Sequence, residues 1–218
     1  YSEDLIGLIW KDRPPLSTNP AFALGTEYTG ESTKDKLARI RKAMEEAKAT
    51  VHVLASLDDI CWTTNLRGDD IEFFPLLLSY AIISMDDMRF YVDGQKLTDQ
   101  MKSDLAENNI KICPYNDIYE DIKKLGANEA VLVDPDKLNY ALYNNIPSEA
   151  KVIEQPNPEI LMKAMKNETE IKNIINAHIK DGVAVPRFMY WIKKNIGKTQ
   201  ITEISAAEKL DSFRKEQE

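Results

Sequence analysis

Helical and extended patterns alternate along the chain between residues 32 and 157. Helical segments repeat apolar residues every three or four positions, whereas strand segments are short apolar runs. The predicted helices span residues 32–49, 57–65, 97–108, 117–126 and 135–145, and the predicted strands span residues 50–56, 76–85, 88–93, 110–113, 129–134 and 150–155. Asp86 and Asp87 form a tight turn between two of the strands, which makes that pair antiparallel. The sequence therefore predicts an α/β domain with a mixed β-sheet flanked by helices.

The first of these helices has a clear beginning and a clear apolar face. Ser32 followed by Asp35 is typical of a helix N-terminus, because the serine oxygen can accept a backbone N–H from the first turn. Leu37, Ile40 and Met44 then fall on one side. This pattern predicts an amphipathic helix.

Two flanking segments differ from the central domain. Residues 1–31 contain several prolines and glycines, so they predict an extended linker, held on a neighbouring surface by Ile9, Trp10 and Phe22. Residues 158–218 show only helical patterns, with helices predicted over 158–165, over 167–196 and from Thr202 towards the end.

The long helix of the second flanking segment carries an apolar stripe: Ile171, Ile174, Ile175, His178, Ile179, Met189 and Ile192. Pro186 lies inside this helix and should kink or split it, because proline removes a backbone hydrogen bond at a cost of roughly 3 kcal/mol. No predicted strands follow to cover the stripe. Residues 158–218 therefore look like the beginning of an incomplete second domain, and we expect the stripe to be buried by self-association or by folding back.

Charge and composition exclude some partners. The net charge of −8 disfavours attraction to nucleic acid or to an anionic membrane, and no apolar run approaches the length of a membrane span. The two cysteines, Cys61 and Cys113, are too few for a disulfide framework. Reduced thiols and a cytoplasmic location are the expectation.

The chain contains none of the common catalytic motifs. Phosphate-binding and dinucleotide-binding glycine patterns, a GxSxG elbow and an HExxH pair are all absent. His52 is expected at a half-buried or edge position of a strand, and His178 is expected as a hydrogen-bonded structural residue. The adjacent aspartates, such as Asp58 and Asp59, are expected mainly to cap backbone N–H groups.

The stretch "CWTTNLRGDDIEFFP", residues 61–75, combines charged and aromatic residues in a way that suits a shaped, partly buried loop. One interpretation is structural: Arg67 pairs with Asp69 inside the loop while Trp62 fills the core. The alternative is that Arg67 projects into a cleft shared with another domain. Spacing alone favours the structural interpretation.

Several motifs resemble one family, the Xaa-Pro aminopeptidases (aminopeptidase P) of the creatinase/prolidase group. The most specific is "LDDICWTTNLRGDDIEFFPLLLSYAII", and "WKDRPPL", "YTGESTKDKLARIRKAME" and "NPEILMKAMKNETEIKNIINAHIKDGVAVPRFMYWI" resemble other parts of the family pattern in the same order. Pro186 departs from it, because the family usually has an aliphatic residue there. The resemblance implies a ribonuclease H-like creatinase N-terminal domain over 32–157. It also implies that residues 1–31 are a linker from a missing first domain, and that residues 158–218 begin a truncated pita-bread peptidase domain.

The resemblance also implies a function for the parent protein, which would cleave peptides with proline at the second position. Two metal ions, usually manganese, would be bound by aspartate, histidine and glutamate side chains that have no counterpart here, so no catalytic or metal-binding residue is assigned and the chain alone is expected to be inactive. In the parent, such domains border the substrate mouth and can contribute to dimer contacts. Trp62, Arg67, Asp69 and Asp70 are the candidates for that mouth. The alternative is a stand-alone interaction module without peptidase activity.

Overall fold

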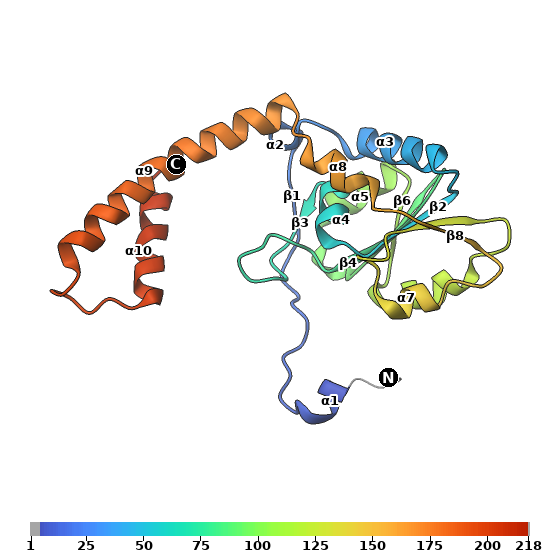
Figure 1. Cartoon of the computed structure of the whole chain (residues 1–218), viewed down its shortest axis with the longest axis horizontal. Coiled ribbons are helices and arrows are strands. Elements are labelled where there is room, and N and C mark those ends of the chain that lie inside the picture. The colour runs from blue at the N-terminus through green and yellow to red at the C-terminus, as the bar shows by residue number, and fades with distance from the viewer. Residues whose placement is uncertain (1–4, 218) are drawn as a thin grey trace. The chain divides into compact units, whose positions relative to one another are not determined.

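The computed structural model describes residues 5–217, which form two compact units, one through residue 165 and the other from residue 166. The first unit contains a β-sheet with helices packed against it (Figure 1). The sheet has six strands in the order β6-β5-β4-β2-β7-β8. Its strands are β2 (Val51–Leu54), β4 (Ser79–Ser84), β5 (Met88–Val92), β6 (Ile110–Cys113), β7 (Ala130–Val133) and β8 (Lys151–Glu154). Only β4 runs antiparallel to its neighbours in this sheet. The predicted mixed α/β sheet is confirmed.

Helices cover both faces of this sheet. The face that we call the α3 face carries α3 (Thr33–Glu46), α4 (Leu57–Thr64), α5 (Asp99–Glu107) and α8 (Pro158–Ala164). The opposite face, the α6 face, carries α6 (Ile118–Asp121) and α7 (Tyr140–Asn144). Successive strand residues point to opposite faces, so Phe90 packs under the α3 face and Tyr91 under the α6 face. Three short 3₁₀ helices complete the connections: η1 (Gly94–Lys96), η2 (Tyr115–Asp117) and η3 (Ile122–Lys124).

The first long helix forms as predicted. The Ser32 hydroxyl accepts a hydrogen bond from the Asp35 backbone N–H at 3.2 Å, and Leu37, Ile40 and Met44 are fully buried. By contrast, α7 begins at Tyr140 with Asn139 as its cap, five residues after the predicted start at residue 135.

The segment before the domain is attached by its backbone. Its short elements are α1 (Leu5–Ile9), β1 (Phe22–Ala23) and α2 (Thr26–Thr29). Strand β1 pairs antiparallel with β3 (Leu66–Arg67). The buried Ala21 donates its backbone N–H to the Lys96 carbonyl at 2.9 Å. The predicted anchors were wrong, because Ile9, Trp10 and Phe22 are all exposed. Strand pairing, which needs no large side chain, holds this segment instead.

The second unit consists of α9 (Glu168–Asn195) and α10 (Glu203–Lys215). Asn167 and Glu170 form a reciprocal capping box at the start of α9, and the helix runs through Pro186 without the predicted split. Arg214 bonds to Asp181 at 2.7 Å and joins the two helices.

Most of the apolar stripe on α9 is exposed to solvent in the single chain, including Ile171, Ile175, Ile179 and Met189. Folding back within residues 5–217 therefore does not cover these four side chains, and self-association stays a prediction. His178 is exposed as well, and no described residue hydrogen-bonds to it, so its expected structural role was wrong. None of the helices between residues 5 and 217 combines the length and apolar character that a bilayer crossing requires.

Candidate functional site

The candidate loop begins at the end of α4. Asn65 adopts the left-handed conformation with φ of 56°, which ends the helix and turns the chain into β3. Asparagine tolerates this conformation better than most residues. The Asn65 side chain then accepts a hydrogen bond from the Lys36 ammonium at 2.6 Å, so helix α3 fixes the turn.

Trp62 supports the loop from inside the domain. Only 6% of its surface is exposed, and the Lys36 ammonium lies 4.5 Å from the ring centroid while donating to the Trp62 carbonyl at 2.8 Å. A cation over an aromatic face in a buried setting stabilises both groups. Trp62 is therefore a core residue in this chain.

Asp70 is half of a buried ion pair. Its Oδ1 lies 2.6 Å from the Lys96 ammonium, and the two side chains are 1% and 3% exposed. Its other oxygen accepts the Leu78 N–H at 2.7 Å. Because both carboxylate oxygens are bonded, Asp70 ties the far end of the loop to η1 and to the start of β4.

Arg67 and Asp69 lie closer to solvent. The Arg67 guanidinium donates to the carbonyls of Cys61 and Leu66, and Asp69 accepts a hydrogen bond from the Asn19 amide at 3.0 Å. The buried ion pair of this loop thus joins Asp70 to Lys96. Sequence spacing could not reveal Lys96, because it lies 26 residues further along the chain.

Close packing explains the glycine of the loop. A Cβ atom at Gly68 would lie 3.1 Å from the Leu76 carbonyl oxygen and 3.2 Å from Leu77 Cδ1. The Leu77 N–H also approaches the Cys61 sulfur at 3.4 Å, and burial raises the pKa of the Cys61 thiol. Cys61 is therefore a buried packing residue.

The tip of the loop presents apolar side chains to solvent. Phe73 is 95% exposed and has φ of 63°, and Ile71 and Phe74 beside it are also exposed. Together with Phe22 and Asp69 they line an open groove of about 600 Å³. Phe73 adds nothing to the domain core, although its backbone conformation is unfavourable and its ring is exposed to water. Such a residue is typical of a surface that contacts another molecule or domain.

Sequence reasoning missed a second polar cluster, between α8 and the rest of the first unit. Lys163 pairs with both Asp58 and Asp59, and the Asn157 amide donates to Asp59 at 3.0 Å. Asp58 also interacts with backbone N–H groups of the first turn of α4, as the capping prediction expected, whereas Asp59 bonds to Lys163 and Asn157. Their partners lie about a hundred residues away in the chain, so no local pattern could identify them.

His52 belongs to the same region and corrects another prediction. It is fully buried on β2, between β4 and β7, with Nδ1 3.0 Å from the Leu132 carbonyl and Nε2 3.2 Å from Glu159. A carbonyl and a carboxylate both accept, so this setting suits the doubly protonated imidazolium. Burial lowers the pKa of His52, but the Glu159 carboxylate outweighs it, and the pKa is raised overall. This histidine clamps α8 onto the sheet.

The described residues do not fit a metal pair. Between residues 5 and 217, no three His, Cys, Asp or Glu side chains come together as metal ligands. The Asp58 and Asp59 carboxylates already surround the Lys163 ammonium. The groups assembled here support a loop and clamp a helix.

Comparison with known proteins gives this architecture a family. The model of the creatinase/prolidase N-terminal domain matches residues 12–170. A probable Xaa-Pro aminopeptidase P from Neurospora crassa is 38% identical over 99% of this chain, and Xaa-Pro aminopeptidase 1 from Dictyostelium discoideum is 38% identical over 94% of it.

Solved structures agree in fold. X-prolyl aminopeptidase from Caenorhabditis elegans, described as a cytosolic enzyme with a di-nuclear active site, matches 98% of this chain with a TM-score of 0.89 and 30% identity. The Xaa-Pro dipeptidase from Bacillus anthracis matches with a TM-score of 0.60 at 20% identity, which shows the fold alone. The chain spans 33% of the length of both curated relatives and 36% of the C. elegans protein. The chain thus belongs to the creatinase/prolidase family, as a member that contains the family's N-terminal domain.

Proposed function

We propose that this chain is the non-catalytic N-terminal and middle portion of a metal-dependent Xaa-Pro aminopeptidase. The parent would hydrolyse the peptide bond between an N-terminal residue and proline, and two manganese ions would activate the attacking water from a site outside residues 1–218. The observation that carries this proposal is the near-complete coverage of the chain by Xaa-Pro aminopeptidases of which it spans only a third.

The role of this domain in the parent would be to border the substrate mouth. The sequence candidates Trp62, Arg67, Asp69 and Asp70 divide into two groups by burial. Trp62 and Asp70 would support the loop from within, while Arg67 and Asp69 would lie on the bordering surface. The exposed Phe73 would extend that surface.

A cytoplasmic location and self-association complete the proposal. Both cysteines are buried free thiols, which suits a reducing compartment. The exposed apolar side chains of α9 would become buried, either by the remainder of the peptidase domain or by a second copy.

The decisive experiment compares two proteins made from the same gene. Reading the gene beyond the codon for residue 218 and expressing the longer product should yield manganese-dependent release of the N-terminal residue from an Xaa-Pro peptide. The 218-residue chain assayed beside it should release none and retain no stoichiometric manganese. Equal metal-dependent cleavage by both proteins would refute the division of labour.

The mouth itself is tested in the longer product. Phe73→Ser should alter the KM for long peptides more than for a tripeptide, because only a long substrate reaches the loop. Phe22→Ser, on the same groove but away from the tip, is the matched control. Identical KM values for all substrates in both variants would remove the loop from the substrate path.

A stand-alone interaction module is the second candidate function. The exposed stripe on α9, which includes Ile171, Ile175 and Ile179, favours it. A stop codon directly after residue 218, together with a stable dimer of the 218-residue chain in analytical ultracentrifugation, would establish this alternative.

A further inference from the structure

At two places in the sheet, the segments that follow two adjacent parallel strands pack on opposite faces of the sheet. After β2 the chain enters α4 on the α3 face, whereas after the adjacent β7 it enters α7 on the α6 face. After β5 it enters α5 on the α3 face, whereas after the adjacent β6 it enters α6 on the α6 face. In open α/β sheets, ligands bind in the crevice that such divergence creates at the carboxyl ends of the strands.

The chain fills the first crevice with its own side chains. Asn157, only 3% exposed, donates its backbone N–H to Asp134 Oδ2 at 3.1 Å just beyond β7. Its side-chain amide reaches Asp59 on α4 at 3.0 Å. The segment that leads into α8 therefore lies between β7 and α4 at this crevice.

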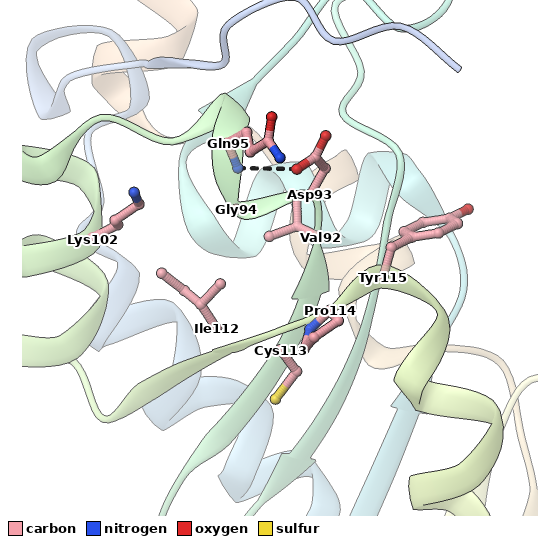
Figure 2. Close-up of a pocket in the computed structure, with 9 residues that line it drawn as sticks. All are labelled: Val92, Asp93, Gly94, Gln95, Lys102, Ile112, Cys113, Pro114 and Tyr115. Carbon is pink, nitrogen blue, oxygen red and sulfur yellow. Dashed lines mark hydrogen bonds between the residues drawn. The ribbon is translucent and has the colours of Figure 1, made fainter. Parts of the chain in front are cut away.

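The second crevice, between β5 and β6, is open. A hollow of about 710 Å³ lies at the carboxyl ends of these strands, within the size range of small-molecule sites. Its lining includes Val92, Asp93, Gln95, Lys102, Ile112 and Tyr115. Figure 2 shows Asp93 and Gln95 together on one side and Lys102 on another, with Ile112 between them.

Two opposite charges border this hollow. One oxygen of Asp93 accepts the Gln95 N–H at 3.0 Å, which orients the carboxylate, and no described residue donates to the other oxygen. Lys102 has only a loose contact with Asp99, at 3.9 Å, on the exposed side of α5. An acceptor and a cation are therefore both available to a ligand.

The apolar residues between the charges narrow the ligand class further. Ile112, which is half-buried near the end of β6, supplies an apolar surface on the α3 face, and the fully buried Val92 lies on the same face at the end of β5. A phosphate would meet the Asp93 carboxylate, and a purely apolar molecule would leave both charges unused. A small zwitterion with apolar side chains can meet the Asp93 carboxylate, the Lys102 ammonium and the apolar Ile112 at the same time. The hollow of about 710 Å³ suits a ligand of two amino acids better than a single amino acid.

We propose that the open crevice between β5 and β6 binds a dipeptide, with its ammonium at Asp93, its carboxylate at Lys102 and its apolar side chains over Ile112. This inference goes beyond the peptidase proposal and does not depend on it, because the crevice lies entirely within residues 92–115 of the described chain.

The test is a titration of the ¹⁵N-labelled 218-residue chain with leucyl-leucine, followed by NMR. The amide signals of Gly94, Gln95 and Ile112 should shift together and saturate below about 10 mM. N-acetyl-leucyl-leucine lacks the ammonium and leucyl-leucine amide lacks the carboxylate, so each should bind about tenfold more weakly, as expected for loss of one charge-assisted hydrogen bond. Free leucine should bind more weakly than the dipeptide.

Variants locate the two charges. Asp93→Asn should weaken the binding of leucyl-leucine about tenfold and leave the affinity for the N-acetyl probe unchanged. Lys102→Met should also weaken the binding of leucyl-leucine about tenfold, but leave the affinity for the amide probe unchanged. Glu107→Gln and Lys111→Met are the matched controls, because they change exposed charges outside the lining. Both variants should bind leucyl-leucine as tightly as the unmodified 218-residue chain does. Because the modified probes are tested on the unmodified chain, a misfolded variant does not decide the outcome. Absence of saturable shifts, or equal affinity for all three probes, would overturn the proposal.

Discussion

Replacing Lys96 by methionine isolates the buried ion pair that supports the candidate loop. Methionine keeps most of the side-chain length, but it removes the ammonium that lies 2.6 Å from Asp70 Oδ1. The Asp70 carboxylate would remain 1% exposed, with only the Leu78 N–H as a described hydrogen-bond donor. An anion in that position has lost both water and its counterion.

The expected cost follows from this uncompensated charge. Breaking a buried pair by removing one partner typically costs about 3 to 5 kcal/mol. For a unit of this size, that loss lowers the melting temperature by roughly 10 °C. Asp70→Asn combined with Lys96→Met removes both charges, so the double variant should recover at least about 2 kcal/mol relative to the sum of the single changes.

Urea unfolding followed by circular dichroism measures these free energies, and hydrogen exchange at the Leu78 amide reports on the loop itself. Lys123→Met is the control. The Lys123 ammonium lies 2.7 Å from the Glu120 carboxylate, close to the Lys96–Asp70 distance, but both side chains of this pair are exposed. That change should cost less than about 0.5 kcal/mol. If Lys96→Met costs no more than Lys123→Met, the carboxylate is solvated and the reasoning from burial fails.

Three further predictions concern other contacts. The His52–Glu159 pair raises the pKa of His52 in the folded state above its ordinary value of 6.5. The contribution of the pair to stability is therefore complete below pH 6.5 and declines as the pH rises through the folded-state pKa. His52→Gln should flatten this pH dependence of the unfolding free energy when urea unfolding is measured at several pH values. Gly68→Ala should destabilise the chain by about 1 to 3 kcal/mol, because the new methyl group meets the Leu76 carbonyl, and unchanged unfolding would show that the loop moves aside. Phe73→Asn should leave the unfolding free energy unchanged or raise it by up to about 1 kcal/mol, since asparagine tolerates a positive φ, and a clear loss in the same assay would mean that Phe73 packs on the domain.

The position of α8 illustrates how tertiary contacts define a unit. The sequence pattern changes at Pro158, where strands give way to helices. In the structure, however, Glu159 bonds to His52 and Lys163 bonds to Asp59, so α8 packs with the preceding domain. A change of periodicity marks a change of element type, but it does not say which surface the new element covers.

Periodicity and capping depend on residues a few positions apart, so they were enough to predict the α/β class, the succession of strands and helices along the central domain, and the start of α3 at Ser32. The resemblance to the family was also visible in the sequence, in motifs that follow one another along the chain. The central position of β2, which buries His52, and the pairing of Lys96 with Asp70 became visible only in the folded chain. The physical reason is that strand order and ion pairing join residues that are distant in sequence, and no local pattern encodes such a meeting.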